Sequence, residues 1–447
     1  MALTQVDKPY SYTRKGQRLY VVYTSDNSGN TGFKFGFKLT EVASGKQYQV
    51  FISPDPQGRG VFDMAPLVNL RHQDEYTGSF DLHEDTIYEP IGWGYNEYNI
   101  EITEWWVVDG VFTQNEEAVD TISEMVVTNS YFQPFQGYKP DVMNPPASCY
   151  YSWEVPMNFT AAEDYWLAYS DRYFGTSNWY KSFFSGDDII YIACRWTDIG
   201  HLTFSTSNLL TSNALDGIRV KYFNASGGFI SQESISLNAN SPLIHVGCYP
   251  ACQTITVPSI CAAYEVYGVA SNGTSRVSAR YIFYNEEEVG NWNQNCNYTP
   301  IRVAWVNSRA GWDYWNFQLK SERTTQIERK QYNSVLKTDF DYGFEGGTFA
   351  PFRNETRMLT DRSNLNTTSL LVTSDWLTDG EFTFLRSLLV ANQVQIINTV
   401  DGIDGKPCYQ FIPVSIEQTS FAEQKNKDGK LHNITLNLKY SQPYWSH

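Results

Sequence analysis

The sequence predicts a mainly β protein made of two or three antiparallel β-sandwich domains, with a single helix flanking the C-terminal one. Three observations support this fold class. Aromatic residues make up 16% of the 447 residues, and aromatic side chains favour strands. Short segments alternate apolar and polar residues at the period of two that a half-buried strand requires. Turn-forming pairs such as Asp109-Gly110 and Asn272-Gly273 separate these segments at hairpin spacing.

The composition limits the classes of partner. Hydrophobic residues account for 42% of the chain and charged residues for only 18%, which is typical of a folded protein. The formal net charge of −16 repels nucleic-acid phosphates, so we expect no nucleic-acid partner. No apolar run approaches the roughly 18–20 residues of a membrane helix, and residues 1–7 do not resemble a secretory signal. We therefore expect no membrane insertion, and folding in a cytosol.

The first domain is expected to span residues 1–130. Phe33–Leu39 alternates large apolar residues with small or basic ones, which predicts a strand, and a short helix is predicted within residues 61–70. A linker is expected over residues 131–148, because four prolines in this span are incompatible with a helix or a strand ladder. These prolines are Pro134, Pro140, Pro145 and Pro146.

A hairpin is predicted near the end of this domain. Trp105 and Trp106 precede Asp109-Gly110, a pair that favours a tight turn because both of its positions need positive φ. Adjacent residues of a strand point to opposite faces. One of the two tryptophans is therefore expected to face a second sheet or a partner.

The second domain, residues 149–298, is predicted to be an immunoglobulin- or fibronectin-like β-sandwich. Ile218–Phe223 and Phe229–Ile230 flank a Gly-rich turn and predict one hairpin. Tyr264–Val269 and Val277–Phe283 flank an Asn-Gly turn and predict another. Short strands at this spacing are typical of a small antiparallel sandwich.

The third domain, residues 299–447, is predicted to be a β-sandwich with one helix. Ile301–Val306 predicts its first strand, and the helix is expected at about residues 378–391, before a strand at Val394–Ile397. Glu381 falls in the first turn of the helix, where a negative charge is favourable. The apolar residues at helical spacing are Phe382, Leu385, Leu388 and Leu389.

Three segments, in the same order, resemble a family of structural tail- or baseplate-type proteins of tailed bacteriophages, especially phages of Bacteroidetes and marine bacteria. The first is Pro54–Asp63, which reads Pro-Asp-Pro-Gln-Gly-Arg-Gly-Val-Phe-Asp. The second is Cys296–Tyr314, with Ala310 and Trp312 where the family has Gly and Phe. The third runs from Trp376-Leu377 through the predicted helix to Pro413-Val414.

The resemblance implies a role in virion structure and not in catalysis. It also implies that the third domain is similar to the tail-tube type of fold, a β-sandwich with one flanking helix, which is an analogy of fold alone. Copies of such a protein are expected to close into a ring through head-to-tail contacts.

A cluster of cysteines and one histidine is the sharpest candidate for a metal site. His245, Cys248, Cys252 and Cys261 could supply four zinc ligands, and Cys248 with Cys252 fits the close pair of such sites. Only one cysteine follows nearby, so buried free thiols are the favoured interpretation, and a disulfide formed after lysis is a third. We therefore assign no metal, cofactor or catalytic residue.

The sequence gives little support for an enzyme. Three pairs of carboxylates could in principle act as a glycosidase pair, but solvated loops are the favoured interpretation. No Gly-x-Ser-x-Gly motif and no Gly-rich phosphate loop is present. The carboxylate pairs are Asp187-Asp188, Asp339 with Asp341, and Asp401 with Asp404.

Aromatic segments support binding to other proteins or to sugars. Strand packing and subunit contacts are favoured over sugar stacking, because aromatics are enriched in both cores and interfaces. The segments are Trp105-Trp106, Tyr131-Phe132, Trp166, Trp179-Tyr180 and Trp312–Trp315.

The expected function is that of a structural virion protein, a tail hub, baseplate or adaptor component that forms a homo-oligomeric ring. Its expected partners are copies of itself and other tail proteins or fibres. The expected location is the virion tail, after assembly in the host bacterial cytoplasm. A receptor- or carbohydrate-binding tail module that binds a host surface glycan is the alternative, and a tail glycosidase is a weaker one.

Overall fold

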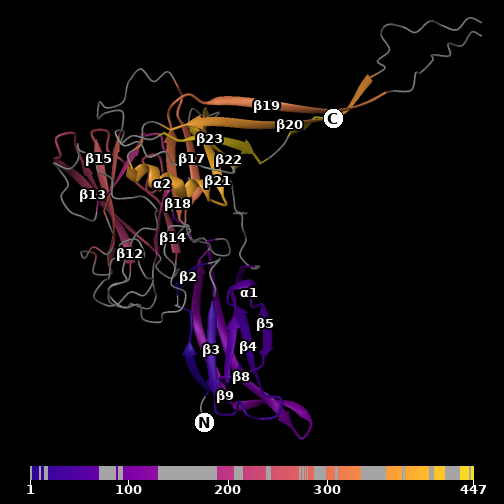
Figure 1. Ribbon diagram of the computed structural model, residues 1–447. Coiled ribbons are helices and arrows are strands. Elements are labelled where there is room, and N and C mark those ends of the chain that lie inside the picture. The colour runs from indigo at the N-terminus through magenta and orange to yellow at the C-terminus, as the bar shows by residue number, and fades with distance from the viewer. Residues whose placement is uncertain are drawn as a thin grey trace, which may run out of the picture.

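The computed structural model describes residues 3–9, 12–14, 19–69, 87–88, 94–128, 189–205, 215–237, 243–270, 273, 276, 278, 280–285, 298–307, 311–333, 359–374, 377, 379–401, 407–417, 433–441 and 444–446. Within these residues the chain forms 24 strands, in five sheets, and two helices. The prediction of a mainly β fold with antiparallel sandwiches is confirmed (Figure 1). No helix in this part of the chain is long and apolar enough to cross a membrane. The expected linker at 131–148 lies outside the described residues.

Two facing sheets form the N-terminal sandwich. The smaller sheet has the order β1 (Leu3–Asp7), β3 (Tyr20–Ser25), β6 (Arg59–Asp63). The larger has the order β2 (Tyr12–Arg14), β9 (Val111–Thr128), β8 (Tyr95–Val108), β4 (Lys34–Glu41), β5 (Gln47–Ile52). A short helix, α1 (Ala65–Asn69), follows β6, as the sequence predicted.

Alternation along β4 explains the core of this sandwich. Phe35, Phe37 and Leu39 are buried between the two sheets, as the apolar and polar pattern of this segment predicted. The predicted turn between β8 and β9 is also present, with φ of 51° at Asp109 and 81° at Gly110. The β8–β9 hairpin extends beyond the sandwich at the end that carries this turn (Figure 1).

The middle region contains a five-stranded and a three-stranded sheet. The first has the order β10 (Ile189–Cys194), β16 (Arg280–Asn285), β15 (Ala263–Ala270), β12 (Leu215–Phe223), β13 (Phe229–Ser236), and both predicted hairpins belong to it. The second has the order β11 (His201–Ser205), β14 (Leu243–Gly247), β7 (Ile87–Tyr88). Two features were not predicted: β10 pairs with β16 in parallel, and β7 joins this region from the segment before residue 130.

The C-terminal region is one eight-stranded sheet with a helix on it. The order is β18 (Trp312–Phe317), β17 (Ile301–Val306), β21 (Val394–Asp401), β22 (Pro407–Ile416), β23 (Thr435–Tyr440), β20 (Leu359–Thr373), β19 (Glu322–Asn333), and β24 (Tyr444–Ser446) pairs with β20. The helix, α2 (Asp379–Leu389), lies where the sequence predicted it, and Phe382, Leu385 and Leu388 are buried.

The two faces of this sheet belong to different cores. On β17, Val303 and Trp305 point to the core that α2 covers. Ala304 and Val306 point the other way, into a core that they share with the middle region. Alternate positions of one strand therefore join α2 to one face and the middle region to the other, so that apolar packing crosses the expected domain boundary at residues 298–299.

Candidate functional site

An aromatic patch lies on the outer face of the N-terminal sandwich, and its residues come from β5, β8 and β9 of the larger sheet. We call Phe51, Trp105, Val107 and Phe112 the outer aromatic patch. Trp105 stacks on Phe112 with ring centroids 5.3 Å apart, and Phe51 meets these rings edge-on at 5.2 and 5.6 Å. The cross-strand pairing of Val107 with Phe112 places both side chains on the face that carries Trp105.

The neighbouring tryptophan points the other way, as predicted for adjacent residues of a strand. Trp106 packs against the N-terminal core and stacks on Phe33, with ring centroids 6.4 Å apart. Trp105 is thus left on the outer face because Trp106 occupies the inner one. The sequence identified the two tryptophans, but not Phe51 and Phe112, which lie close to Trp105 only because β5 and β9 belong to the same sheet as β8.

Trp105 is held in place by its own sheet. Its indole Nε1 donates a hydrogen bond to Thr103 Oγ1 at 2.9 Å, and that hydroxyl donates to the carbonyl of Gly36 at 3.2 Å. A Cβ atom at Gly36 would lie 2.8 Å from Trp105 Nε1 and 2.5 Å from Thr103 Oγ1. The indole therefore lies directly over a glycine backbone, and its position is fixed before any partner binds.

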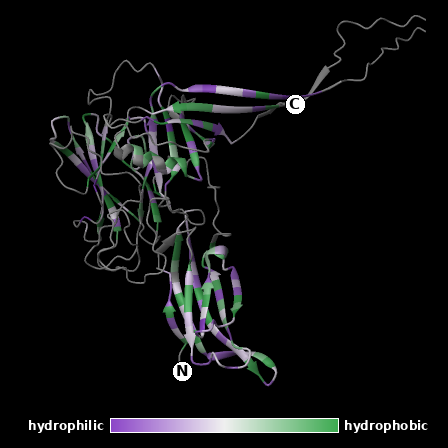
Figure 2. Cartoon of the chain, viewed as in Figure 1, coloured by the Kyte–Doolittle hydropathy of each residue, from purple (hydrophilic) through white to green (hydrophobic). Residues whose placement is uncertain are grey.

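The outer aromatic patch is large, apolar and partly exposed. Phe51, Val107 and Phe112 are 40%, 37% and 39% exposed, although each is a residue that folding normally buries. Figure 2 shows further hydrophobic residues at the end of the β8–β9 hairpin, where Val108 and Val111 are exposed on the opposite face from Val107 and Phe112. A contiguous patch of this kind is typical of a surface that a partner covers.

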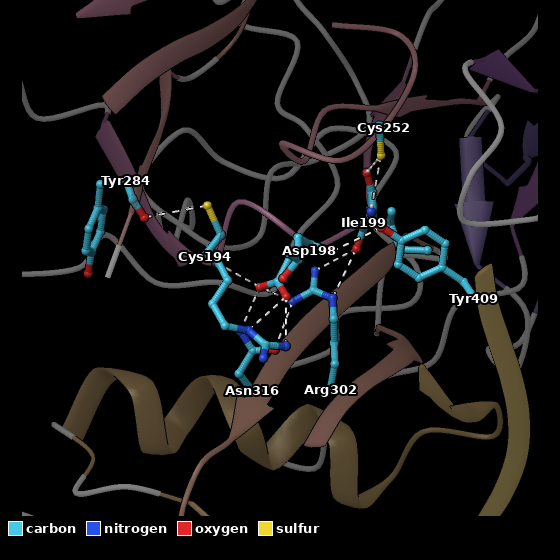
Figure 3. Close-up of polar contacts among 11 residues, drawn as sticks. Cys194, Asp198, Ile199, Cys252, Tyr284, Arg302, Asn316 and Tyr409 are labelled. Atoms are coloured by element: carbon cyan, nitrogen blue, oxygen red, sulfur yellow. Dashed lines mark hydrogen bonds and ion pairs between the residues drawn. The ribbon is translucent and has the colours of Figure 1, made fainter. Parts of the chain in front are cut away.

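A buried ion pair joins the middle region to the C-terminal sheet. Arg302 on β17 donates from Nη1 to Asp198 Oδ2 at 3.1 Å, and from Nε and Nη2 to the carbonyl of Ile199 at 3.0 and 2.8 Å (Figure 3). Asn316 on β18 accepts from Arg302 Nη1 at 3.1 Å and donates to Asp198 Oδ2 at 2.8 Å. Arg195 donates from Nε and Nη2 to the other carboxylate oxygen, Asp198 Oδ1, at 3.3 and 3.1 Å.

The charges at this junction stabilise each other. Burial alone would raise the pKa of the Asp198 carboxyl, but Arg302 and Arg195 outweigh burial and hold that pKa below its usual value. The Arg302 guanidinium also lies 4.6 Å from the Tyr249 ring centroid and 4.9 Å from that of Tyr314. A shifted carboxyl can mark a catalytic site, but Asp198 is buried and its oxygens accept hydrogen bonds from the protein, which fits a structural role.

Three of the four metal-ligand candidates are directed to other partners. Cys252 Sγ lies 3.2 Å from the carbonyl of Gly200, and Cys261 Sγ lies 3.1 Å from that of Ala263. His245 Nδ1 is 2.6 Å from Thr203 Oγ1. Among the described residues, no three His, Cys, Asp or Glu side chains are grouped closely enough to hold a metal ion.

The cysteines with described side chains form no disulfide, and their thiols are buried. Burial raises the pKa of the Cys248 thiol well above its usual value, with Cys252 adding to the effect, so this thiol stays protonated. The set with described side chains is Cys194, Cys248, Cys252 and Cys261. They pack as small apolar groups in and around the core of the middle region.

Several sequence candidates lie outside the described residues or side chains. These are Tyr131-Phe132, Trp166, Trp179-Tyr180, Asp187-Asp188, Asp339, Asp341, Asp401 and Asp404. Trp312–Trp315 forms most of β18, and its rings pack into cores, with Trp312 and Tyr314 fully buried and Trp315 partly so. This segment is therefore not a surface for stacking on sugars.

Comparison with known proteins adds no family. No protein-family model matches the chain, and no curated protein matches it. Among solved structures, a crystal structure of the FN1–FN3 domains of chicken CNTN1 is matched at 10% identity and a TM-score of 0.16. The match covers 64% of this chain and 67% of the CNTN1 chain. A TM-score this low carries no argument about fold or function.

Proposed function

We propose that this chain is a structural protein of a bacteriophage tail, which assembles with copies of itself and binds neighbouring tail proteins. Its place is a hub, baseplate or adaptor ring in the virion, formed after synthesis in the host bacterial cytoplasm. The role is one of assembly and not of catalysis. The resemblance of three ordered segments to phage tail proteins suggests the class.

The outer aromatic patch is the observation that carries this proposal. Its Trp105 ring is fixed in advance by hydrogen bonds through Thr103 to the backbone of Gly36, so this ring loses little conformational freedom when a partner covers it. Rigid aromatic anchors of this kind dominate the binding energy of protein interfaces. A tail ring, whose subunits touch on several sides, supplies such partners.

A host glycan is the second candidate for this patch, because sugars also stack on aromatic rings. Sugar sites combine the ring with polar groups that orient the ligand. Here Trp105 Nε1 and Thr103 Oγ1 are already bonded to each other, and Val107, the remaining exposed member of the patch beside the rings, is apolar. These features favour a protein partner.

The test replaces one ring and measures assembly. We expect wild-type protein to form rings by light scattering and negative-stain microscopy, and to bind purified tails. Phe112→Ser should raise the dissociation constant of self-assembly, or of binding to tails, about 30-fold, since a central aromatic contributes about 2 kcal/mol. Phe229→Ser is the matched control, because Phe229 is 59% exposed on β13 in a different region.

Gly36→Ala provides a second variant that removes no apolar surface. The added methyl group must displace Trp105 or Thr103, so binding should fall while the composition of the patch is unchanged. A wild-type chain that stays monomeric and is missing from purified virions would overturn the proposal. Saturable binding of host glycan that Phe112→Ser abolishes would support the sugar alternative instead.

A further inference from the structure

The sequence did not predict the arm that β19 and β20 form. These strands pair over 12 positions, from Glu322 with Leu371 to Asn333 with Leu359, and project from the C-terminal sheet (Figure 1). Every residue from Glu322 to Gln331 is exposed, including Ile327 at 52%. Beyond residues 364–366, where β24 pairs with β20, the arm is a two-stranded ribbon. Such a ribbon is at best marginally stable alone, and its outer strand leaves a line of backbone groups for pairing.

The outer strand of the arm carries a small excess of basic residues in an acidic protein, while the charges of Asp361 and Arg362 in β20 cancel each other. Three of the five charged residues of β19 are basic, namely Arg323, Arg329 and Lys330, although the chain carries a net charge of −16. Arg323 lies at the root, where Nη2 donates to Tyr440 Oη at 3.2 Å. Among the described residues, Arg329 and Lys330 form no ion pair with the chain's own carboxylates.

The β8–β9 hairpin has the complementary character. From Val111 to Thr121, β9 contains Glu116, Glu117 and Asp120 and no basic residue. Both glutamates are exposed, and Val119 beside them is 46% exposed. This hairpin lies at the opposite end of the molecule from the arm, so the two cannot meet within one chain (Figure 1).

We propose that the β19–β20 arm of one copy docks on the acidic β8–β9 hairpin of the next copy. Arg329 faces the exposed carboxylates Glu116 and Glu117 of the neighbour, and Ile327, on the same face of β19, covers exposed aliphatic surface such as Val119. Lys330 adds positive charge from the opposite face of the strand. The contact joins two different surfaces, so repetition closes a ring or extends a filament. This inference rests on the proposed self-assembly and names the surfaces that mediate it.

The test reverses the charges on each side. One variant carries Arg329→Glu with Lys330→Glu, and the other carries Glu116→Lys with Glu117→Lys. All four side chains are exposed, so both variants should retain wild-type circular dichroism and thermal unfolding. For each variant alone, the dissociation constant of self-association should rise at least about tenfold, as measured by light scattering of the full chain.

Mixing the two variants is the decisive step. Each arm then finds a hairpin of opposite charge on the other variant, so the equimolar mixture should recover wild-type assembly. Lys8→Glu with Lys46→Glu changes the net charge as the arm variant does, at exposed positions away from the arm, and should leave assembly unchanged. The charge contact should also weaken with added salt.

The outcomes separate this inference from the proposed function. Wild-type rings that persist in both reversed variants, or variants that fail to complement each other, would overturn the docking of arm on hairpin while leaving the ring itself intact. A wild-type chain that never self-associates would overturn both.

Discussion

Asp198 carries a negative charge in a buried place where water cannot solvate it, so the ionised carboxylate is stabilised by Arg302 and Arg195 instead. Because these partners hold its pKa below the value of about 3.9 for an unfolded aspartate, the folded state favours the ionised form. That stabilisation is present above about pH 4 and is lost as the pH falls through the lower, folded pKa. Asp198→Asn should therefore cost about 3 kcal/mol or more near pH 7, because it leaves the buried Arg302 without its counter-charge.

Urea unfolding between pH 7 and pH 2.5 measures this effect. The wild-type and Asp198→Asn curves should converge as the pH falls below 4, because protonation removes in the wild type the charge that the variant already lacks. Asp55→Asn is the control, since Asp55 also has a lowered pKa, through its hydrogen bonds with Arg59, but lies at the surface. Parallel curves for the wild type and Asp198→Asn would contradict the role assigned to this carboxylate.

Helix α2 shows how one face of an element is fixed by its sheet. Leu388 is fully buried against the C-terminal sheet, and Ser387 accepts a hydrogen bond from Trp305 Nε1 at 2.9 Å. Leu388→Ala should lower the free energy of unfolding by about 2–5 kcal/mol, whereas Leu389→Ala, at a half-buried position, should cost clearly less. Equal losses in chemical denaturation would mean that the helix packs differently.

Elements with a strong local pattern could be predicted from the sequence. β4 alternates apolar residues with small or polar ones, and β17 is a nearly continuous apolar run. α2 repeats apolar residues at helical spacing, and Asp109-Gly110 needs positive φ at both positions. The β19–β20 arm could not be predicted in this way, because β19 is polar and exposed on both faces and so lacks any period.

The two sites also depended on long-range contacts. Arg302 and Asp198 are 104 positions apart, and no local pattern in either segment indicates the other. The outer aromatic patch could be predicted only in part. The pair Trp105-Trp106 stands out in the sequence, whereas Phe51 lies close to Trp105 only because β4 pairs with both β5 and β8. Sequence periodicity reports which face of a strand is buried, but it does not report which strands become neighbours.

At the scale of the whole molecule, the described cores divide into two groups. The N-terminal sandwich has its own core. The middle region and the C-terminal sheet share a second core, to which β17 and β18 contribute Ala304 and Tyr314, and Arg302 bonds across the same boundary. We therefore expect the middle and C-terminal regions to unfold together, and the N-terminal sandwich to unfold separately.

Differential scanning calorimetry with two conservative substitutions tests this division. Ile102 is buried in the N-terminal core and Ile192 in the shared core, and Ile→Val at either position should cost about 0.5–1.5 kcal/mol. Ile102→Val should lower the temperature of only one unfolding transition, and Ile192→Val that of only the other. Leu388→Ala should lower the temperature of the same transition as Ile192→Val, because apolar packing and Arg302 couple the sheet under α2 to the middle region. If Leu388→Ala instead moved a third transition, the packing across residues 298–299 would be too weak to couple the two regions, and the subunit would be a chain of three independent bodies.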